Sequence, residues 1–245
     1  MIDSTWQERL THHFYRGRDG WIDGTEEFHR LFARVVAPQA KILEIGAGPS
    51  NPTSRFLSSL GKLHGVDPDA SVRSNEALLE ALVIRDERLP FPNEAFDCCV
   101  SNYVAEHIAN PELHLAEVAR VLRPGGAYVF RTPNRYHYVS LTASLTPHWV
   151  HELVANRLRN LSENAHCPYP TVYALNSESA IKRNASEAGL KVEELRLVEK
   201  EPSYGMSSRA LFLAFMCYER LVNASELLSS FRANIFAVLR KPVRH

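Results

Sequence analysis

The sequence predicts an α/β fold: a doubly wound, mostly parallel sheet with helices on both faces. Two observations lead to this prediction. An apolar segment, 41–45, runs directly into a turn that contains Gly46 and Gly48. Apolar and amphipathic segments then alternate as far as Thr132, as in parallel strands joined by helices. The 245 residues, 45% hydrophobic and 23% charged, suffice for one such domain with additions.

The expected elements follow one another in a regular order up to Thr132. Strands are expected at 41–45, 62–66, 82–85, 96–101 and 126–132, with helices at 26–36, 52–60, 71–80 and 111–122. Asn51 and Asn110 are each followed by a proline. In each pair the asparagine supplies the N-cap and the proline supplies the first helical residue. Beyond Thr132 we expect a helix at 177–188, a strand at 191–198, a helix around 211–221 and a last strand at 234–239.

The neutral charge and the lack of a recognisable targeting signal argue against several classes of protein. Lys+Arg and Asp+Glu both number 28, so the chain lacks the basic excess typical of nucleic-acid enzymes. The N-terminus has no apolar core of signal-peptide type, and the longest apolar run, 210–218, is far short of the ~20 residues of a membrane span. The four cysteines show no Cys-x-x-Cys spacing. We therefore expect a cytoplasmic protein without disulfides or stable membrane insertion.

Polar residues capable of chemistry follow the ends of the predicted strands. Glu44 comes just before the glycine turn, whose bare backbone would let a cofactor approach closely. Asp67 ends the second strand, where it could accept hydrogen bonds from both ribose hydroxyls of a nucleoside. The third strand leads into Asp86-Glu87-Arg88-Leu-Pro-Phe-Pro92, and the fourth into Asn102-Tyr103 and Glu106-His107. Because ligands of such sheets bind at the carboxyl ends of the strands, these residues form the candidate site.

With Leu122-Arg-Pro-Gly-Gly126 and Arg131-Thr-Pro-Asn134, these motifs resemble class I S-adenosylmethionine-dependent methyltransferases. Within that class the chain is most similar to the small-molecule enzymes related to the ubiquinone and menaquinone methyltransferases. The resemblance covers 40–134 closely and weakens after Leu175. It implies a Rossmann-like sheet of seven strands with the last antiparallel, here 234–239. It also implies S-adenosyl-L-methionine as cofactor.

The resemblance assigns cofactor contacts residue by residue. Gly46 and Gly48 would run under the methionine part, which Glu44 would help to hold, and Asp67 would take the ribose. Asn102 would lie beside the sulfonium. Ser50 stands where the family often has a third glycine, and Arg85 stands where it has an acidic residue near adenine, so Asp86 takes that role here. The expected cofactor-binding set is Glu44, Gly46, Ala47, Gly48, Asp67, Pro68, Asp86, Glu87, Asn102 and Tyr103.

Histidines are the candidate general bases, since their pKa lies near neutral pH. His107 follows the fourth strand, although a histidine fixed by backbone hydrogen bonds would look the same in sequence, and we favour that structural interpretation. His148 and His151 lie in the insertion and are further candidates. Their i, i+3 spacing also fits metal ligands, but no Cys or Asp cluster stands nearby, so we expect no metal. Asp97, at the start of a buried strand, is interpreted as structural.

We expect residues 1–245 to form a single methyltransferase domain. Residues 1–37 would be an N-terminal cap, with Tyr15, Arg18 and Trp21 folding over the cofactor, and 38–134 the cofactor-binding core. Residues 133–175 and 201–231 are too long for plain connections and would be lid or substrate insertions. The expected reaction is methyl transfer to a small-molecule acceptor, with oxygen favoured as the acceptor atom.

Alternatives to this reaction remain open. They are N- or C-methylation of a small molecule or macromolecule, and a catalytically silent cofactor-binding subunit that needs a partner. The fourth strand ends Ser101-Asn-Tyr-Val and lacks the Asn/Asp-Pro-Pro-Tyr/Phe type of site that acts on nucleic-acid amines. We therefore expect no nucleic-acid substrate. A homodimer is one possible assembly.

Overall fold

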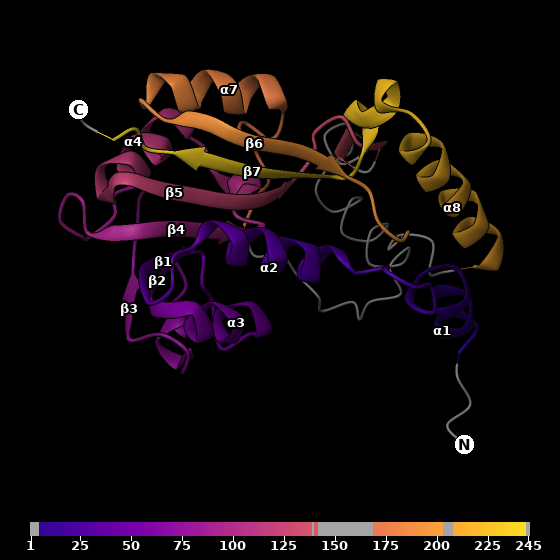
Figure 1. Cartoon of the computed structure of the whole chain (residues 1–245), viewed down its shortest axis with the longest axis horizontal. Coiled ribbons are helices and arrows are strands. Elements are labelled where there is room, and N and C mark those ends of the chain that lie inside the picture. Colours follow the sequence, from indigo (N-terminus) through magenta and orange to yellow (C-terminus); the bar gives the residue numbers. More distant parts are fainter. Residues whose placement is uncertain (1–4, 139, 142–168, 203–207, 244–245) are drawn as a thin grey trace. The chain divides into compact units, whose positions relative to one another are not determined.

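A computed structural model describes residues 5–138, 140–141, 169–202 and 208–243 (Figure 1). The strands are β1 Ala40–Ile45, β2 Gly61–Asp67, β3 Glu80–Val83, β4 Phe96–Asn102, β5 Leu122–Pro133, β6 Lys191–Val198 and β7 Asn234–Arg240. The helices are α1 Trp6–Thr11, α2 Gly24–Val35, α3 Pro52–Leu60, α4 Pro111–Val121, α7 Glu178–Glu187 and α8 Arg209–Asn223. A π-helical turn, η1 His12–Arg16, follows α1, and short 3₁₀ turns are η2 Ala70–Ser74, η3 Ala105–His107 and η4 Glu226–Phe231.

All strands belong to one seven-stranded sheet of order β3-β2-β1-β4-β5-β7-β6. The strands β1 to β5 pair in parallel, and the chain order reverses between β1 and β4. The last strand, β7, is antiparallel, because Gly125 at the start of β5 bonds Lys241 beyond the end of β7, whereas Asn134 bonds Ala233 before its start. The predicted doubly wound sheet with an antiparallel last strand is confirmed.

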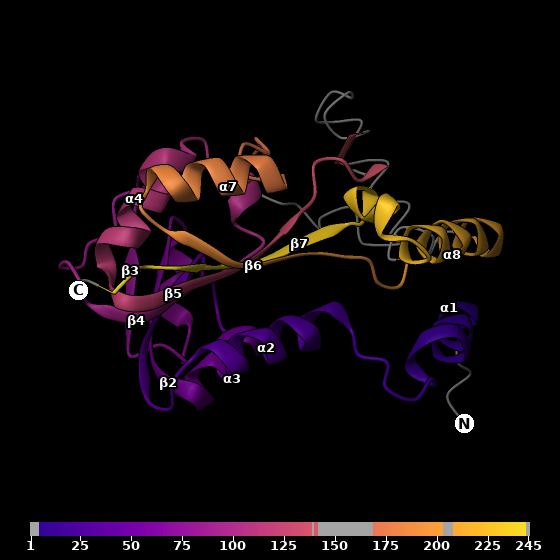
Figure 2. The same ribbon diagram turned by 45° about the horizontal axis from the view of Figure 1, so that its top comes forward.

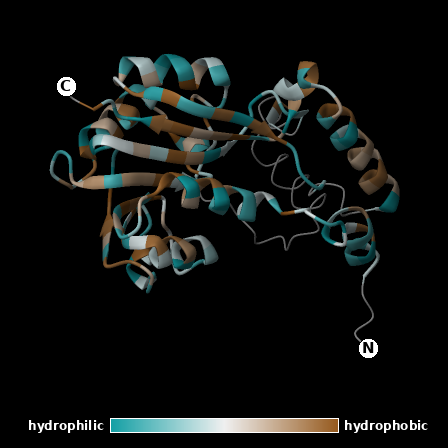
Figure 3. Cartoon of the chain, viewed as in Figure 1, coloured by the Kyte–Doolittle hydropathy of each residue, from teal (hydrophilic) through white to brown (hydrophobic). Residues whose placement is uncertain are grey.

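Helices cover both faces of this sheet. Figure 2 shows α4 and α7 on one face and α2 and α3 on the other. The strand β7, an inner strand, is buried along its central residues, whereas the edge strand β6 alternates partly exposed and exposed residues. The same contrast appears in Figure 3, where β7 is mainly hydrophobic and β6 mixed. An inner strand covered on both faces needs a continuous apolar run, and an edge strand does not.

The predicted caps form as expected. The Asn51 side chain accepts a hydrogen bond from the Ser54 amide, and Asn110 does the same for Leu113, each ahead of a proline at the first helical position. Ser177, expected as the first residue of its helix, instead caps α7 by accepting a hydrogen bond from the Ala180 amide. These bonds satisfy backbone N–H groups that have no partner within the helix.

The helix predicted at 71–80 is wrong. The structure has only the short turn η2, Ala70–Ser74, and β3 already begins at Glu80, two residues before its predicted start. The chain leaves the helical path at Asn75, whose side-chain amide is buried and points to the carbonyl oxygens of Ala47 and Gly48 and to the Ser54 hydroxyl. Because the Asn75 side chain bonds a loop distant in sequence, the backbone at Asn75 is held in a non-helical conformation. Local helix propensity does not reveal such a contact.

The chain divides into two compact units, each described here by itself. One comprises 28–133, 171–196 and 235–245 and contains the body of the sheet, and we call it the sheet unit. The other comprises 1–27, 134–170 and 197–234; its described part includes α1, η1, α8 and η4, and we call it the helical unit. None of the helices in the described ranges has the length and apolarity needed to span a bilayer.

Aromatic side chains and a buried amide hold the helical unit together internally. The Phe212 ring packs edge-on against the Trp6 and Tyr15 rings, with centroids 6.4 and 6.5 Å apart. The buried Asn134 amide donates to the carbonyl oxygens of Ser230 (2.7 Å) and Arg232 (2.8 Å). Segments far apart in sequence therefore share one small core.

Candidate functional site

The glycine turn after β1 lies at the point where the strand order reverses. Gly46 has φ of +74° and Gly48 has φ of +56°, a left-handed conformation that favours glycine. A Cβ on Gly46 would lie 2.3 Å from Cγ2 of Val104, whereas a Cβ on Gly48 would have no atom within 4 Å. Gly46 is thus required by packing, and the backbone at Gly48 borders open space.

Asp67 connects β2 to this turn. Its side chain is buried, with Oδ2 accepting a hydrogen bond from the Gly48 amide (3.0 Å) and Oδ1 from the Asp69 amide (2.8 Å). Because each carboxylate oxygen can accept two hydrogen bonds, one acceptor position per oxygen remains for ligand hydroxyls. Ala47 is buried and its amide, like that of Gly46, donates to the Val66 carbonyl, while Pro68 is exposed beside Asp67.

Glu44 is a buried carboxyl group just ahead of the turn. Its Oε2 accepts a hydrogen bond from the Ser54 hydroxyl at 2.7 Å. Burial raises the pKa of Glu44 to about 7, and the neighbouring Asp67 carboxylate adds to this, although the bond from Ser54 opposes it. A cationic group bound beside Glu44 would favour its ionised form, so the site suits the ammonium end of an amino acid.

Asn102 ends β4 and Tyr103 follows it, at the same edge of the sheet. The Asn102 Oδ1 accepts a hydrogen bond from Nε of the buried Arg131 (2.7 Å), whose guanidinium carbon lies 4.5 Å from the Tyr103 ring centroid. Tyr103 has φ of +58°, which costs a non-glycine residue on the order of 1–3 kcal/mol and concentrates at functional sites. Its strained backbone therefore supports the expectation that this segment faces a ligand.

The acidic residues after β3 have partners within the protein. The exposed Asp86 carboxylate accepts from the Arg88 amide (2.9 Å) and so stabilises a turn. Glu87 forms an ion pair with Nδ1 of the buried His114 (3.3 Å). The adenine contact assigned to Asp86 and the cofactor contact expected of Glu87 remain predictions, and Glu87 in addition pairs with the first residue of a buried polar chain.

That chain is a feature that sequence reasoning missed. His114 Nε2 lies 3.1 Å from the Tyr128 hydroxyl, which lies 2.7 Å from the Ser101 hydroxyl. All three are buried, and Ser101 immediately precedes Asn102. No local motif marks these residues, because they come from α4, β5 and β4 and meet only in the folded sheet. Asn75 was missed for the same reason.

Of the candidate general bases, the structure describes His107 but not His148 and His151. His107 ends the turn η3, is half-buried, and donates its amide to the Val104 carbonyl (2.9 Å). The neighbouring Glu106 is buried and bonded to Thr132, and burial raises the pKa of its carboxyl group. His148 and His151 lie outside the described residues.

Two further predictions concern metals and Asp97. Within the described ranges, no three His, Cys, Asp or Glu side chains gather as metal ligands. Asp97 accepts the Lys41 amide (2.8 Å) and pairs with Arg123 (2.6 Å), so its structural role is confirmed.

The sheet order, the glycine turn and the buried acid that ends β2 are those of a Rossmann-like methyltransferase fold. Residues 43–130 match the family described as "Methyltransferase domain". A probable S-adenosylmethionine-dependent methyltransferase from Mycolicibacterium smegmatis is 32% identical over 150 residues, which are 59% of this chain and 58% of that protein. Residues 43–130 therefore match a methyltransferase domain, and the chain is similar over 59% of its length to an S-adenosylmethionine-dependent methyltransferase.

Two other similar proteins show how far the match extends along the chain and along the fold. A protein of transposon TN4556 from Streptomyces fradiae is 28% identical over 196 residues, 71% of this chain and 56% of that protein. The chain thus spans little more than half the length of these two relatives. The YcgJ protein from Bacillus subtilis superposes with a TM-score of 0.56 at 18% identity, covering 90% of this chain and 100% of that one, which shows the fold alone.

Proposed function

We propose that this protein transfers the methyl group of S-adenosylmethionine to an oxygen atom of a small molecule. The observation that carries the proposal is the turn itself: Gly48 borders open space while its amide is held by the buried Asp67 carboxylate. A cofactor could lie over this backbone with its ribose hydroxyls on Asp67 and its methionine end near Glu44. S-adenosylmethionine, when bound, supplies a methyl group activated by a positively charged sulfur.

The residues of the chain position the reactants in this proposal. Asn102 would lie beside the sulfonium, and Arg131 holds the Asn102 side-chain oxygen. The acceptor oxygen would attack the methyl carbon in line as the carbon–sulfur bond breaks, with the bonding electrons remaining on sulfur. Alignment alone contributes on the order of 7–11 kcal/mol in well-oriented reactions.

Oxygen is favoured as the acceptor because of the residues at the end of β4 and in the turn beyond it. The sequence Ser101-Asn-Tyr-Val lacks the paired prolines of sites that act on nucleic-acid amines. Of the three candidate histidines, His107 in the turn η3 is the one that lies within the described residues. It would take the proton of an acceptor hydroxyl. We propose no nucleic-acid substrate, in agreement with the zero formal net charge.

The test is turnover with matched acceptors. The purified protein is incubated with S-adenosylmethionine and pairs of phenols and anilines of equal size, and S-adenosylhomocysteine release is measured by chromatography. We expect turnover with the phenols, lowered roughly 10²-fold or more by His107→Gln if His107 is the base. Turnover confined to anilines would overturn oxygen as the acceptor. Cofactor binding without turnover would favour the silent subunit.

A further inference from the structure

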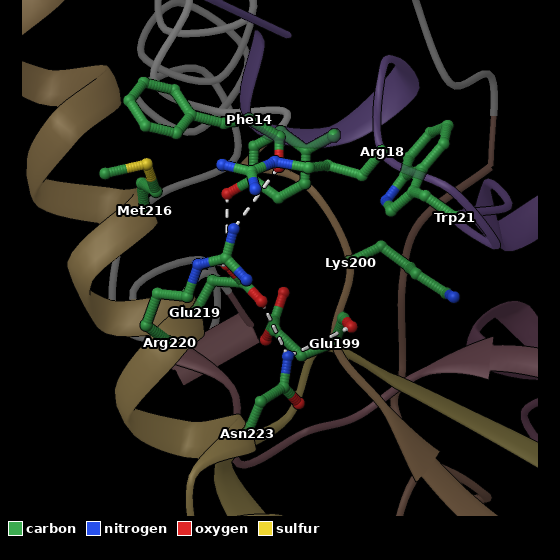
Figure 4. Close-up of a pocket in the computed structure, with 10 residues that line it drawn as sticks. Phe14, Arg18, Trp21, Glu199, Lys200, Met216, Glu219, Arg220 and Asn223 are labelled. Carbon is green, nitrogen blue, oxygen red and sulfur yellow. Dashed lines mark hydrogen bonds and ion pairs between the residues drawn. The ribbon is translucent and has the colours of Figure 1, made fainter. Parts of the chain in front are cut away.

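The helical unit contains a pocket whose lining includes none of the residues of the expected cofactor-binding set. Its volume is about 610 Å³, within the range of small-molecule sites. All its lining residues belong to 1–27 and 197–234, so it lies within one unit. They are Phe14, Tyr15, Arg18, Trp21, Glu199, Lys200, Met216, Glu219, Arg220 and Asn223 (Figure 4).

The acidic groups of this pocket are already engaged within the protein. Glu219 is buried; its Oε2 accepts from the Tyr15 hydroxyl (3.0 Å) and its Oε1 from the Asn223 amide (2.8 Å). Glu199 accepts from the Ala233 amide (2.9 Å), and burial raises the pKa of its carboxyl group to about 8. Glu199 is therefore mainly protonated at pH 7, so the two acids together contribute about one negative charge.

The basic groups outnumber that charge. Lys200 forms an ion pair with Glu27, which does not itself line the pocket; Nζ of Lys200 lies 2.5 Å from Oε2 of Glu27. Arg220 lies over the Tyr15 ring, with 5.4 Å between its guanidinium carbon and the centroid, and Nε is 3.4 Å from Glu219. Arg18 is exposed and, among the residues that the structure describes, forms no ion pair. When Glu27 is counted, the named charged groups leave one net positive charge in the pocket, and Arg18 is the cation that pairs with no carboxylate of the described residues.

The remaining lining residues are apolar or aromatic. Figure 4 shows Phe14 and Met216 at one end of the view and Trp21 at the other, with the Arg18 side chain extending between them. Aromatic rings and a thioether provide a large, polarisable contact surface for a flat apolar body. A guanidinium, in turn, binds carboxylate or phosphate oxygens through paired N–H donors.

We propose that this pocket binds a small organic anion, with an apolar ring system against Phe14, Trp21 and Met216 and a carboxylate or phosphate on Arg18. All residues that this proposal uses belong to the helical unit, and none belongs to the expected cofactor-binding set. The proposal therefore stands independently of methyl transfer.

The test uses three probes that share one ring and differ in charge: 2-naphthoate, 2-naphthylmethanol and 2-naphthylmethylammonium. Binding to the full chain is measured by calorimetry and by saturation-transfer NMR. We expect naphthoate to bind about tenfold or more tightly than the alcohol, and the ammonium to bind most weakly. Naphthyl phosphate in place of naphthoate distinguishes a phosphate from a carboxylate ligand.

Variants separate the pocket from the rest of the chain. Arg18→Gln should lower naphthoate affinity about tenfold and leave the alcohol unchanged, whereas Arg9→Gln, an exposed arginine of α1 outside the pocket, should change neither. Unchanged thermal unfolding shows that both variants fold. Equal binding of naphthoate and the alcohol would overturn the proposal, as would equal effects of the two variants or displacement of naphthoate by S-adenosylhomocysteine.

Discussion

The two glycines of the turn after β1 should respond differently to the same substitution. In Gly46→Ala, the new Cβ would lie 2.3 Å from Cγ2 of Val104, and φ is +74°. In Gly48→Ala, φ is +56° and nothing lies within 4 Å of the new Cβ. Both variants therefore carry the strain of a left-handed alanine, but only the first also creates a steric clash.

The magnitudes follow from these two terms. An alanine in a left-handed conformation lowers the free energy of unfolding by about 1–2 kcal/mol. Replacing glycine also lowers the conformational entropy of the unfolded chain, which raises the free energy of unfolding by about 0.4–1 kcal/mol. Gly48→Ala should therefore lower the free energy of unfolding by about 1 kcal/mol. Overpacking against Val104 adds about 1–3 kcal/mol, so Gly46→Ala should lower it by about 3 kcal/mol.

Cofactor binding and folding stability should respond differently to Gly46→Ala and Gly48→Ala. If the cofactor lies over the Gly48 backbone, the added methyl group occupies its space, and Gly48→Ala should lose S-adenosylhomocysteine binding by at least tenfold while staying folded. Urea unfolding gives the stabilities and calorimetry the affinities. Wild-type affinity in Gly48→Ala would refute the placement of the cofactor, and equal stability of the two variants would refute the steric argument.

Two buried networks give further predictions. The pKa of Glu199 is about 8 in the folded protein, above its usual range, so the folded state holds a proton that the unfolded state lacks. Ionisation of Glu199 should therefore lower the free energy of unfolding by about 2 kcal/mol between pH 6.5 and 8.5. Burial lowers the pKa of His137 to about 4, so this histidine stays neutral over the same pH range. Urea unfolding should show a correspondingly flatter pH dependence in Glu199→Gln, and an unchanged slope would contradict the assignment. Tyr128→Phe should lower the free energy of unfolding by about 1–3 kcal/mol, because His114 and Ser101 both lose a buried partner; a loss below 0.5 kcal/mol would show that the chain is not stabilising.

The order of elements in the sheet could be predicted because it depends on local patterns. Asn51 and Asn110 with their following prolines mark helix starts, and buried strands such as β1 and β4 are continuous apolar runs. The prediction failed at 71–80, where the apolar pattern suggests a helix but the Asn75 amide binds a loop 26 to 28 residues away in sequence.

The candidate site was predictable to the same extent. Glu44 and Asp67 lie at the carboxyl ends of β1 and β2, and Gly46 and Gly48 follow β1. A parallel sheet brings these strand ends to one edge, so sequence order alone indicates that the residues are close together. The partners that set their properties are not visible in sequence. Ser54, which bonds Glu44, and Arg131, which bonds Asn102, come from other elements, and the pocket at Arg18 combines segments about 200 residues apart.

The most direct test of the account is calorimetric titration of S-adenosylmethionine and S-adenosylhomocysteine into the wild type, Asp67→Asn and Asp69→Asn. Asp67 is buried on the glycine turn, whereas Asp69 is an exposed cap of η2 two residues away and serves as the matched control. We predict micromolar binding to the wild type and to Asp69→Asn, and a loss of at least tenfold in Asp67→Asn. Absence of binding to folded wild-type protein, or equal binding to all three, would contradict the account.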